Sequence, residues 1–270
     1  MTDRYAIIGH PVAHSKSPEI HAWFAKETGQ NMVYERLLAP LDDFSGTVDR
    51  FRAGGGRGAN VTLPFKLEAF AYASELTLRA RQAGAVNTLK FEGGTVVGDN
   101  TDGIGLYRDI LDNLHIPLKG ARILVLGAGG AARGVIGPLL DGDPAQIAIA
   151  NRTPARAEEI ARQFAHAGTV RAIALADLAA FQFDIVINAT SASIGNGLPA
   201  LPPSCVRPGA LAYEMMYGKG ETPFMQFATR EGARSIDGLG MLIEQAAEAF
   251  LLWRGLRPTT SSLLHKMRGA

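Results

Sequence analysis

The segment ILVLGAGGAARG, residues 123–134, restricts the fold of this chain more than any other stretch. Its apolar run is typical of a strand buried in a parallel sheet, and a helix-like pattern follows directly. Between them stand Gly127, Gly129 and Ala132, in a G-x-G-x-x-A spacing that lets a backbone approach a pyrophosphate at a helix N-terminus. The segment predicts a dinucleotide site in an α/β fold, and a glycine turn without a ligand is the alternative.

Short apolar strands alternate with helical patterns from Ala121 onward. Helices are expected after the glycine turn and again through Ala165. This alternation predicts a parallel, doubly wound, Rossmann-like sheet. The strand-like segments are RILVLG, AQIAIA, TVRAI, FDIVINAT and ALAYEMMY.

The first hundred residues have the pattern of another α/β domain with a sheet of its own. Strands are expected at YAIIG, MVYERLL and AVNTLKF and just before NVT. Helices are expected over residues 18–28, closed by Gly29, and after Pro64. A connecting helix is expected over 106–114, and a final helix over 239–253, whose apolar residues recur at helical spacing, should pack on one domain.

Charge and composition indicate a small-molecule partner. The 270 residues include 27 basic and 26 acidic ones, and no Lys/Arg-rich block suits a nucleic acid or an anionic membrane. The single cysteine, Cys205, excludes an internal disulfide, and the start of the chain lacks the apolar core of a signal peptide. The uncharged run over 185–206 contains prolines, glycines and asparagines typical of a polar loop. We therefore expect a cytoplasmic protein without a transmembrane helix.

The strand after the glycine turn ends in residues that favour NADP over NAD. An acidic residue there would bind the 2′-hydroxyl of NAD, whereas an arginine accommodates the 2′-phosphate of NADP. This chain has Asn151, Arg152 and Thr153, followed by Arg156. A guanidinium offers a planar fork for phosphate. The alternative is that both arginines are solvated surface cations.

A lysine lies at an unfavourable place in the segment GANVTLPFK. Pro64 is suited to the first position of a helix, which puts Lys66 in the first turn, where the helix dipole disfavours a cation by about 0.3–1 kcal/mol. Asn60 and Thr62 precede it at strand spacing, on one face. Three hydrogen-bonding side chains can therefore converge on one polar ligand, which predicts an active site.

Two further segments carry polar side chains next to expected helix starts. PVAHSKSPEIH places Ser15 and Ser17 before Pro18, so that the two hydroxyls could hold a carboxylate, and the alternative is that Ser17 is a helix N-cap. In GDNTDG, Asp102 could orient a proton transferred by Lys66, and the alternative is a turn or N-cap residue.

Three histidines lie close together in the sequence, at His10, His14 and His21. Their segment runs from a strand through a loop into a helix, with no cysteine or carboxylate cluster nearby, which argues against zinc. We expect chemistry without a metal.

An ordered set of motifs along the whole chain closely resembles the shikimate dehydrogenase family. The resemblance implies NADP-dependent interconversion of 3-dehydroshikimate and shikimate, a step towards chorismate and the aromatic amino acids. It also implies a substrate-binding and catalytic domain of residues 1–102 plus 239–270, with a mixed sheet, and a Rossmann-like NADP-binding domain of residues 103–238. The motifs are AHSKSPEIH, GANVTLPFK, GAVNTL, GDNTDG, GAGGAAR, NRT, INATS and DGLGMLIEQAAEAF.

The resemblance also implies roles for individual residues. Lys66 and Asp102 would be the catalytic pair, while Ser15 and Ser17 would hold the substrate carboxylate and Tyr217 would close that end. The residues implied around the ring hydroxyls and the reacting carbon are Asn60, Thr62, Asn87 and Gln245, together with the catalytic pair.

For the cofactor, the resemblance implies three groups of residues. The pyrophosphate would be lined by Gly127, Ala128, Gly129, Gly130 and Ala131. The adenosine 2′-phosphate would be held by Asn151, Arg152, Thr153 and Arg156. The ribose and the nicotinamide would lie near Thr190, Met215, Gly238 and Met241.

The segment YEMMYGKGETPF departs from the family pattern, with Glu214 at a usual aspartate and Gly218 at a common proline. These departures put the stiffness of the Tyr217 loop in question.

One rival interpretation is a quinate/shikimate dehydrogenase that also accepts NAD. Another is a sensor with a dinucleotide fold that catalyses nothing, although a sensor has no need for Lys66 and Asp102. The sequence leaves open whether the protein is a monomer or a homodimer.

Overall fold

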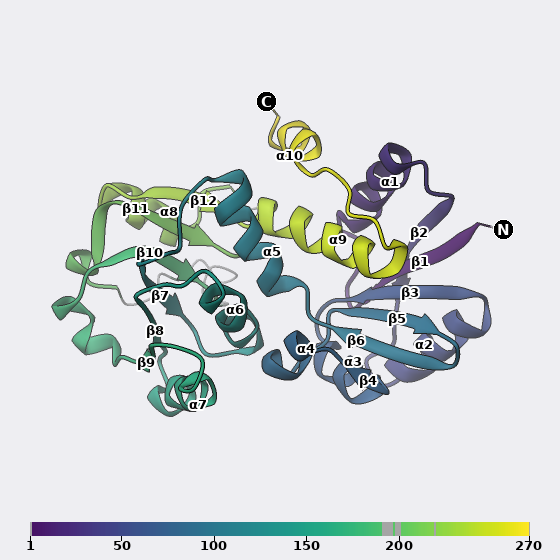
Figure 1. Ribbon diagram of the computed structural model, residues 1–270, viewed down its shortest axis with the longest axis horizontal. Helices are drawn as coiled ribbons and strands as arrows, with labels where there is room; N and C mark the ends of the chain where they lie inside the picture. The colour runs from purple at the N-terminus through teal and green to yellow at the C-terminus, as the bar shows by residue number, and fades with distance from the viewer. Residues whose placement is uncertain (1, 191–196, 198–200, 219, 270) are drawn as a thin grey trace. The chain divides into compact units, whose positions relative to one another are not determined.

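The chain divides into two compact units in the computed structural model of Figure 1, which describes residues 2–190, 197, 201–218 and 220–269. The first unit comprises Met1–Gly105 and Leu242–Ala270, and the second comprises Leu106–Met241. Both crossings lie inside helices, α5 (Asp102–Arg108) and α9 (Leu239–Arg254). The boundaries expected from the sequence stand three residues earlier, at 102 instead of 105 and at 238 instead of 241.

The first unit is built on a mixed sheet of order β2-β1-β3-β5-β6-β4. β1 is parallel to β2 and β3, β5 is antiparallel to β3 and β6, and β4 is parallel to β6. The predicted mixed sheet is confirmed. Its strands are β1 (Asp3–Gly9), β2 (Met32–Leu38), β3 (Gly56–Val61), β4 (Glu75–Leu76), β5 (Thr88–Glu92) and β6 (Thr95–Asp99).

Several helices cover this sheet. The predicted helix after the first strand is α1 (Ser17–Thr28), which ends at Gly29 with φ 65°. The sequence interpretation missed α2 (Phe44–Ala53) and α4 (Leu78–Ala83), both short. α3 (Lys66–Tyr72) follows the Pro64 turn.

The prediction that the chain ends with the helix over 239–253 is wrong, because α10 (Ser261–Arg268) follows it. α10 is short and mostly polar, and it buries Leu263 and Leu264. The ammonium of Lys266 lies 4.6 Å from the centre of the Trp23 ring, which adds a cation–π contact with α1.

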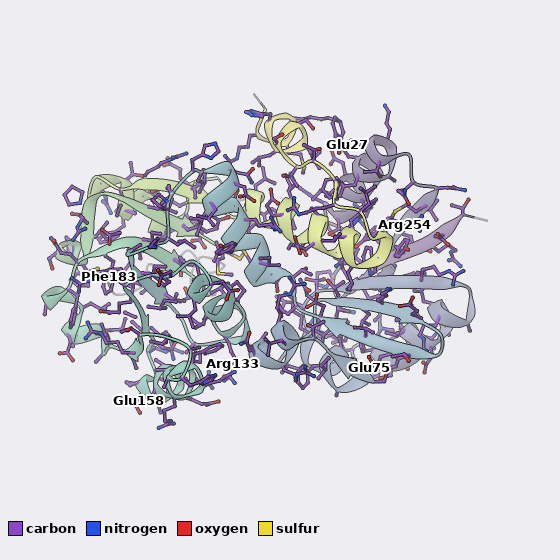
Figure 2. The ribbon with its side chains drawn as sticks, viewed as in Figure 1. Glu27, Glu75, Arg133, Glu158, Phe183 and Arg254 are labelled. Atoms are coloured by element: carbon purple, nitrogen blue, oxygen red, sulfur yellow. The ribbon has the colours of Figure 1, made fainter. Side chains whose placement is uncertain are left out.

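The C-terminal part of α9 docks on the sheet of the first unit. The Trp253 ring stacks on Tyr5 of β1 at 4.7 Å, and its Nε1 donates to the carbonyl of Leu89 in β5 at 3.0 Å. Arg254, labelled in Figure 2, donates to the carboxylate of Asp3 and to the hydroxyl of Tyr5. Aromatic stacking and these hydrogen bonds therefore attach α9 to β1 and β5.

The second unit contains a fully parallel sheet of order β12-β11-β10-β7-β8-β9. Because the chain starts at the central β7 and winds outward in both directions, this is the doubly wound order that the sequence predicted. Its strands are β7 (Arg122–Leu126), β8 (Gln146–Ala150), β9 (Val170–Ala172), β10 (Phe183–Asn188), β11 (Val206–Glu214) and β12 (Arg234–Asp237).

Strand β7 is buried on both faces, as its apolar run indicates. Ile123 and Val125 pack in one core cluster, with Leu106 and Val135, while Leu124 joins a different cluster. The helices of this unit are α6 (Gly130–Leu140), α7 (Pro154–Phe164) and α8 (Pro223–Arg230), with a π-helical turn at Asp109–Asn113 and 3₁₀ turns at Leu175–Ala180 and Pro203–Cys205.

Part of the uncharged run expected to be a polar loop, residues 191–196 and 198–200, lies outside the described residues, and this part includes Ser191 at the end of INATS. The run as a whole is not a loop, because its first four residues belong to β10 and Val206 begins β11. In the ranges that the structure describes, no helix is long and apolar enough to cross a membrane.

We expect Gly58→Ala to destabilise the first unit. A Cβ on Gly58 of β3 would lie 2.5 Å from Trp253 Nε1 and 2.7 Å from the Leu89 carbonyl oxygen, so it would break the hydrogen bond between them. Overpacking of this kind costs about 1–3 kcal/mol. Urea unfolding followed by tryptophan fluorescence measures it, since Trp23 and Trp253 both belong to the first unit.

The matched control is Gly54→Ala, in the same unit. There the nearest atom to a new Cβ is the flexible Arg4 Nη1 at 3.3 Å, and φ is −77°. Equal losses of stability in the two variants would contradict the steric argument.

Candidate active site

Lys66 and Asp102 form an ion pair in the first unit, with 2.5 Å between Nζ and Oδ2. Their side chains are 29% and 18% exposed, so the pair can be reached from solvent. Pro64 does not open the helix, contrary to the prediction. Phe65 N donates to Thr62 O and closes a turn that contains Pro64, so that α3 begins at Lys66 itself. Lys66 therefore lies in the first turn, where the dipole disfavours a cation and Asp102 compensates for it.

Asp102 is the first residue of α5, and the helix starts four residues before the predicted 106. The helix begins this early because the Asn100 side chain accepts a hydrogen bond from Asp102 N, and Gly105 N donates to Thr101 O. The second carboxylate oxygen of Asp102 accepts a hydrogen bond from Asn87 Nδ2 at 2.9 Å. Both oxygens of the carboxylate are thereby oriented.

Asn87 and Gln245 meet beside this pair. Asn87 Oδ1 accepts a hydrogen bond from Thr101 N at 2.8 Å, which fixes the amide. Gln245 Oε1 lies 3.4 Å from Asn87 Nδ2 and 3.3 Å from Thr101 Oγ1, and its Nε2 donates to Leu242 O. The sequence interpretation did not single out Thr101, which is fully buried between the two amides.

Asn60 supports the site from β3. Its Nδ2 donates to Asn87 O and to Thr88 Oγ1, and its Oδ1 accepts a 2.7 Å hydrogen bond from the Tyr34 hydroxyl. These bonds use both amide hydrogens, so Asn60 orients its neighbours. Thr62 is partly exposed two residues later, and its hydroxyl takes part in no hydrogen bond with the described residues.

Ser15 and Ser17 are brought together, but the alternative that Ser17 is the N-cap is wrong. Lys16 is the N-cap, and α1 starts at Ser17. Lys16 already has near-helical dihedrals (φ −84°, ψ −7°), and Ser15 Oγ accepts a hydrogen bond from Ser17 N at 3.2 Å. The two hydroxyl oxygens lie 3.2 Å apart, close enough to bind one ligand group together.

His21 is part of the core. It is fully buried, its ring stacks on Tyr34 at 4.2 Å, and neither ring nitrogen has a hydrogen-bond partner among the described residues. Burial lowers its pKa to about 3, and the nearby Asn60 amide opposes this shift. No group of three histidines, cysteines or carboxylates in the described part of the chain could hold a metal ion.

The buried, neutral His21 should make the first unit sensitive to acid. Its pKa is lower in the folded chain (about 3) than in the unfolded chain (about 6.5), so the unfolded chain gains the proton first. Stability is unaffected above pH 6.5 and falls by about 1.4 kcal/mol per pH unit below it, towards pH 3. Between pH 7 and pH 5, the free energy of unfolding of His21→Phe should therefore fall by about 2 kcal/mol less than that of the wild type.

Urea unfolding by tryptophan fluorescence at the two pH values tests this expectation. The control is His265→Gln, because His265 is an exposed histidine of the same unit. An unchanged pH dependence in His21→Phe would show that His21 does not control acid sensitivity.

In the second unit, the glycine turn leaves open space before a helix. Gly127 has φ 105°, and a Cβ there would lie 3.0 Å from Ala189 O. Gly129 is the N-cap of α6, which begins at Gly130, and no atom lies within 4 Å of a Cβ built on either. Ala131 is exposed as well. Backbone N–H groups at this end therefore face a space that suits a pyrophosphate.

Three arginines follow this turn in the chain, one on α6, one in the loop after β8 and one in the first turn of α7. Arg133 Nη2 pairs with Glu159 of α7 at 2.9 Å, and Figure 2 labels Arg133 on α6. Asn151 Nδ2 donates to Thr153 O at 2.9 Å and shapes the loop before α7. Arg152, Thr153 and Arg156 are exposed, and within the described residues neither arginine side chain makes an ion pair or a hydrogen bond.

The remaining predicted cofactor residues gather at the carboxyl ends of β10, β11 and β12. Thr190 Oγ1 donates to Asn188 Oδ1, Met215 N donates to Asn188 O and Gly238 N donates to Met216 O. A Cβ on Gly238 would lie 2.3 Å from Met215 O, so only glycine fits this close approach. Met241 is buried beside them in the core.

Glu214 holds the start of the Tyr217 loop. Its carboxylate accepts hydrogen bonds from Asn188 Nδ2, Met216 N and Thr222 Oγ1 at 2.9–3.1 Å. Gly218 has φ 78°, which proline cannot adopt, so the loop takes a conformation that the common residue would forbid. Tyr217 is partly buried, and burial raises its pKa.

The fold and the two residue clusters define a two-unit α/β protein with a dinucleotide-type turn and a lysine–carboxylate pair. Sequence profiles match it along its length: the shikimate dehydrogenase substrate binding domain over 7–89, shikimate / quinate 5-dehydrogenase over 109–194, and the shikimate 5′-dehydrogenase C-terminal domain over 238–261. The shikimate dehydrogenase (NADP(+)) of Nitrosospira multiformis is 57% identical over 271 residues, covering 100% of this chain and 98% of the relative.

Solved structures agree with this result. The Ael1 enzyme of Pseudomonas putida has a TM-score of 0.94 and 48% identity, covering 98% of each chain. Shikimate 5-dehydrogenase of Thermus thermophilus, in complex with NADP(H) and shikimate, has a TM-score of 0.87 and 35% identity over 99% of each chain. The chain belongs to the shikimate dehydrogenase family.

Proposed function

We propose that this chain catalyses the reversible, NADPH-dependent reduction of 3-dehydroshikimate to shikimate, with Lys66 as the acid–base group. This reaction leads towards chorismate and the aromatic amino acids. Family membership supports the reaction. The single observation that supports the role of Lys66 is its 2.5 Å contact with Asp102, beside Asn87 and Gln245.

Bound NADPH supplies a hydride to the substrate carbonyl carbon. The carbonyl oxygen must then gain a proton, which Lys66 Nζ is proposed to donate in its ammonium form. Asp102 accepts a hydrogen bond from Nζ and so orients the amine, while Asn87 fixes the carboxylate from its other oxygen. In the reverse direction the neutral amine takes the proton from the shikimate hydroxyl.

The other substrate contacts are proposed from the resemblance of their motifs to the family pattern. Ser15 and Ser17 are proposed to hold the substrate carboxylate, which their adjacent hydroxyls suit. Tyr217 is proposed to close that end. The residues proposed for the ring hydroxyls are Asn60, Thr62, Asn87 and Gln245, with Asn60 acting mainly through its neighbours.

We assign the substrate to the first unit and NADP to the second. The open space before Gly129 and Gly130 fits a pyrophosphate, and the exposed Arg152 and Arg156 suit the 2′-phosphate. The ribose and nicotinamide residues proposed are Thr190, Met215, Gly238 and Met241. We also propose a cytoplasmic location and a monomer or homodimer, with no nucleic-acid partner.

Lys66→Met should lower kcat by about 10²–10⁴-fold and change KM for shikimate much less, because a proton donor acts in the transition state. The measurement is the steady-state rate of NADPH formation from shikimate and NADP, followed by absorbance. The control is Lys90→Met, which removes a paired lysine of the same unit away from these residues. Near-normal turnover by Lys66→Met would refute the proposed role.

Arg152→Gln should raise KM for NADPH by about 10- to 100-fold and leave KM for NADH nearly unchanged, since a charge-assisted bond to phosphate contributes about 1.5–3 kcal/mol. Steady-state kinetics with both cofactors measures the difference. Arg162→Gln, which removes an exposed cation nearer the other end of α7, is the control. A similar rise for both cofactors would contradict a phosphate contact.

Broader specificity is the second candidate, because one matching profile describes shikimate and quinate 5-dehydrogenases together. Initial rates with shikimate and quinate, each with NADP and NAD, separate the candidates. Activity confined to shikimate and NADP supports the strict enzyme. A sensor without catalytic activity would show no turnover with any pair.

A further inference from the structure

An arginine that no motif includes lies beside the two serines of the first unit. Arg36 of β2 donates a hydrogen bond from Nη2 to the backbone carbonyl of Ser15 at 2.5 Å. Tyr34, two residues earlier on the same strand face, stacks on His21 of α1. This face of β2 therefore points towards α1, and the guanidinium reaches Ser15, in the loop directly before the first residue of α1, Ser17.

The charge of Arg36 has no partner within the described residues. Several other arginines of the first unit pair with carboxylates, among them Arg4, Arg79 and Arg257, whereas no ion pair of the described chain includes Arg36. A guanidinium has five N–H donors, and the Ser15 carbonyl accepts a hydrogen bond from only one of its nitrogens, Nη2. An exposed cation thus stands next to two hydroxyl groups that carry no charge.

We infer that Arg36 is a specificity-determining residue that attracts the carboxylate of the substrate to Ser15 and Ser17. The inference rests on the proposed function, which gives the ligand its carboxylate. The two hydroxyls can hydrogen-bond an anion or a neutral ester, and only a cation distinguishes strongly between them. Since Arg36 is exposed, water and salt weaken its attraction for the substrate carboxylate, so its loss should change KM only several-fold.

A purely structural role must be separated from this one, because Arg36 also holds the Ser15 loop. Arg36→Gln removes the charge and keeps an amide that can donate to a carbonyl. A loop displaced by the substitution would weaken binding of every substrate. Loss of a charge contact would weaken binding of the carboxylate alone.

The experiment compares shikimate with its uncharged methyl ester in the wild-type chain and in Arg36→Gln. At low salt, we expect KM for shikimate to rise about three- to tenfold and kcat to change less than about twofold, with no rise in KM for the ester. Where the ester reacts too slowly, its inhibition constant against shikimate replaces KM. Salt should raise KM for shikimate in the wild type more than in the variant.

Two variants complete the comparison. Lys26→Gln removes a cation at the far end of α1, about 13 Å along the helix from Ser17 at 1.5 Å per residue, and should change none of these constants. Lys16→Gln removes the cation between the serines. If Lys16→Gln alone raised KM for shikimate selectively, and Arg36→Gln did not, the inference would be overturned.

Equal rises in KM for shikimate and ester, or no rise for either, would also overturn it. Failure of the wild-type chain to oxidise shikimate would refute the proposed function instead.

Discussion

The short contact between Lys66 and Asp102 is the interaction around which the first unit is organised. A lysine at the start of α3 opposes the helix dipole, and Asp102, the first residue of α5, supplies the compensating charge. Asn87, next to β5, orients the carboxylate from the other side. Three chain segments that are far apart in sequence must therefore meet at one point.

Buried charges hold the supports of that site in place. Asp99, which lies three residues before Asp102, is 1% exposed and accepts hydrogen bonds from Arg79. Arg79 also pairs with Glu248 of α9, and Arg257 bridges Glu248 and Glu244. Because a buried carboxylate must be paired, this network links the loop before Asp102 to the helix that carries Gln245. A surface cation such as Arg36 is not constrained in this way, which leaves it available for a ligand.

Local sequence patterns predicted the parts of the fold in which a single strand, helix or turn restricts the residue types that it can contain. The apolar run of β7 and the glycine turn after it were recognised because a buried parallel strand and a tight turn each restrict residue type. The short helices α2, α4 and α10 were missed, since they are stabilised by a few buried side chains such as Leu263 rather than by a long periodic pattern. The N-cap at Ser17 was wrong because the turn at Lys16 already has helical dihedrals.

By itself, the sequence determined the two α/β patterns, the dinucleotide turn and the identity of the polar side chains, because periodicity, glycine spacing and residue chemistry are local properties. Only the tertiary structure decided which of those side chains meet. The contact of Lys66 with Asp102, the gathering of Asn87 and Gln245, and the place of Arg36 beside Ser15 all depend on long-range packing. Contacts between distant residues arise from how the sheet and the helices pack, and no local pattern encodes them.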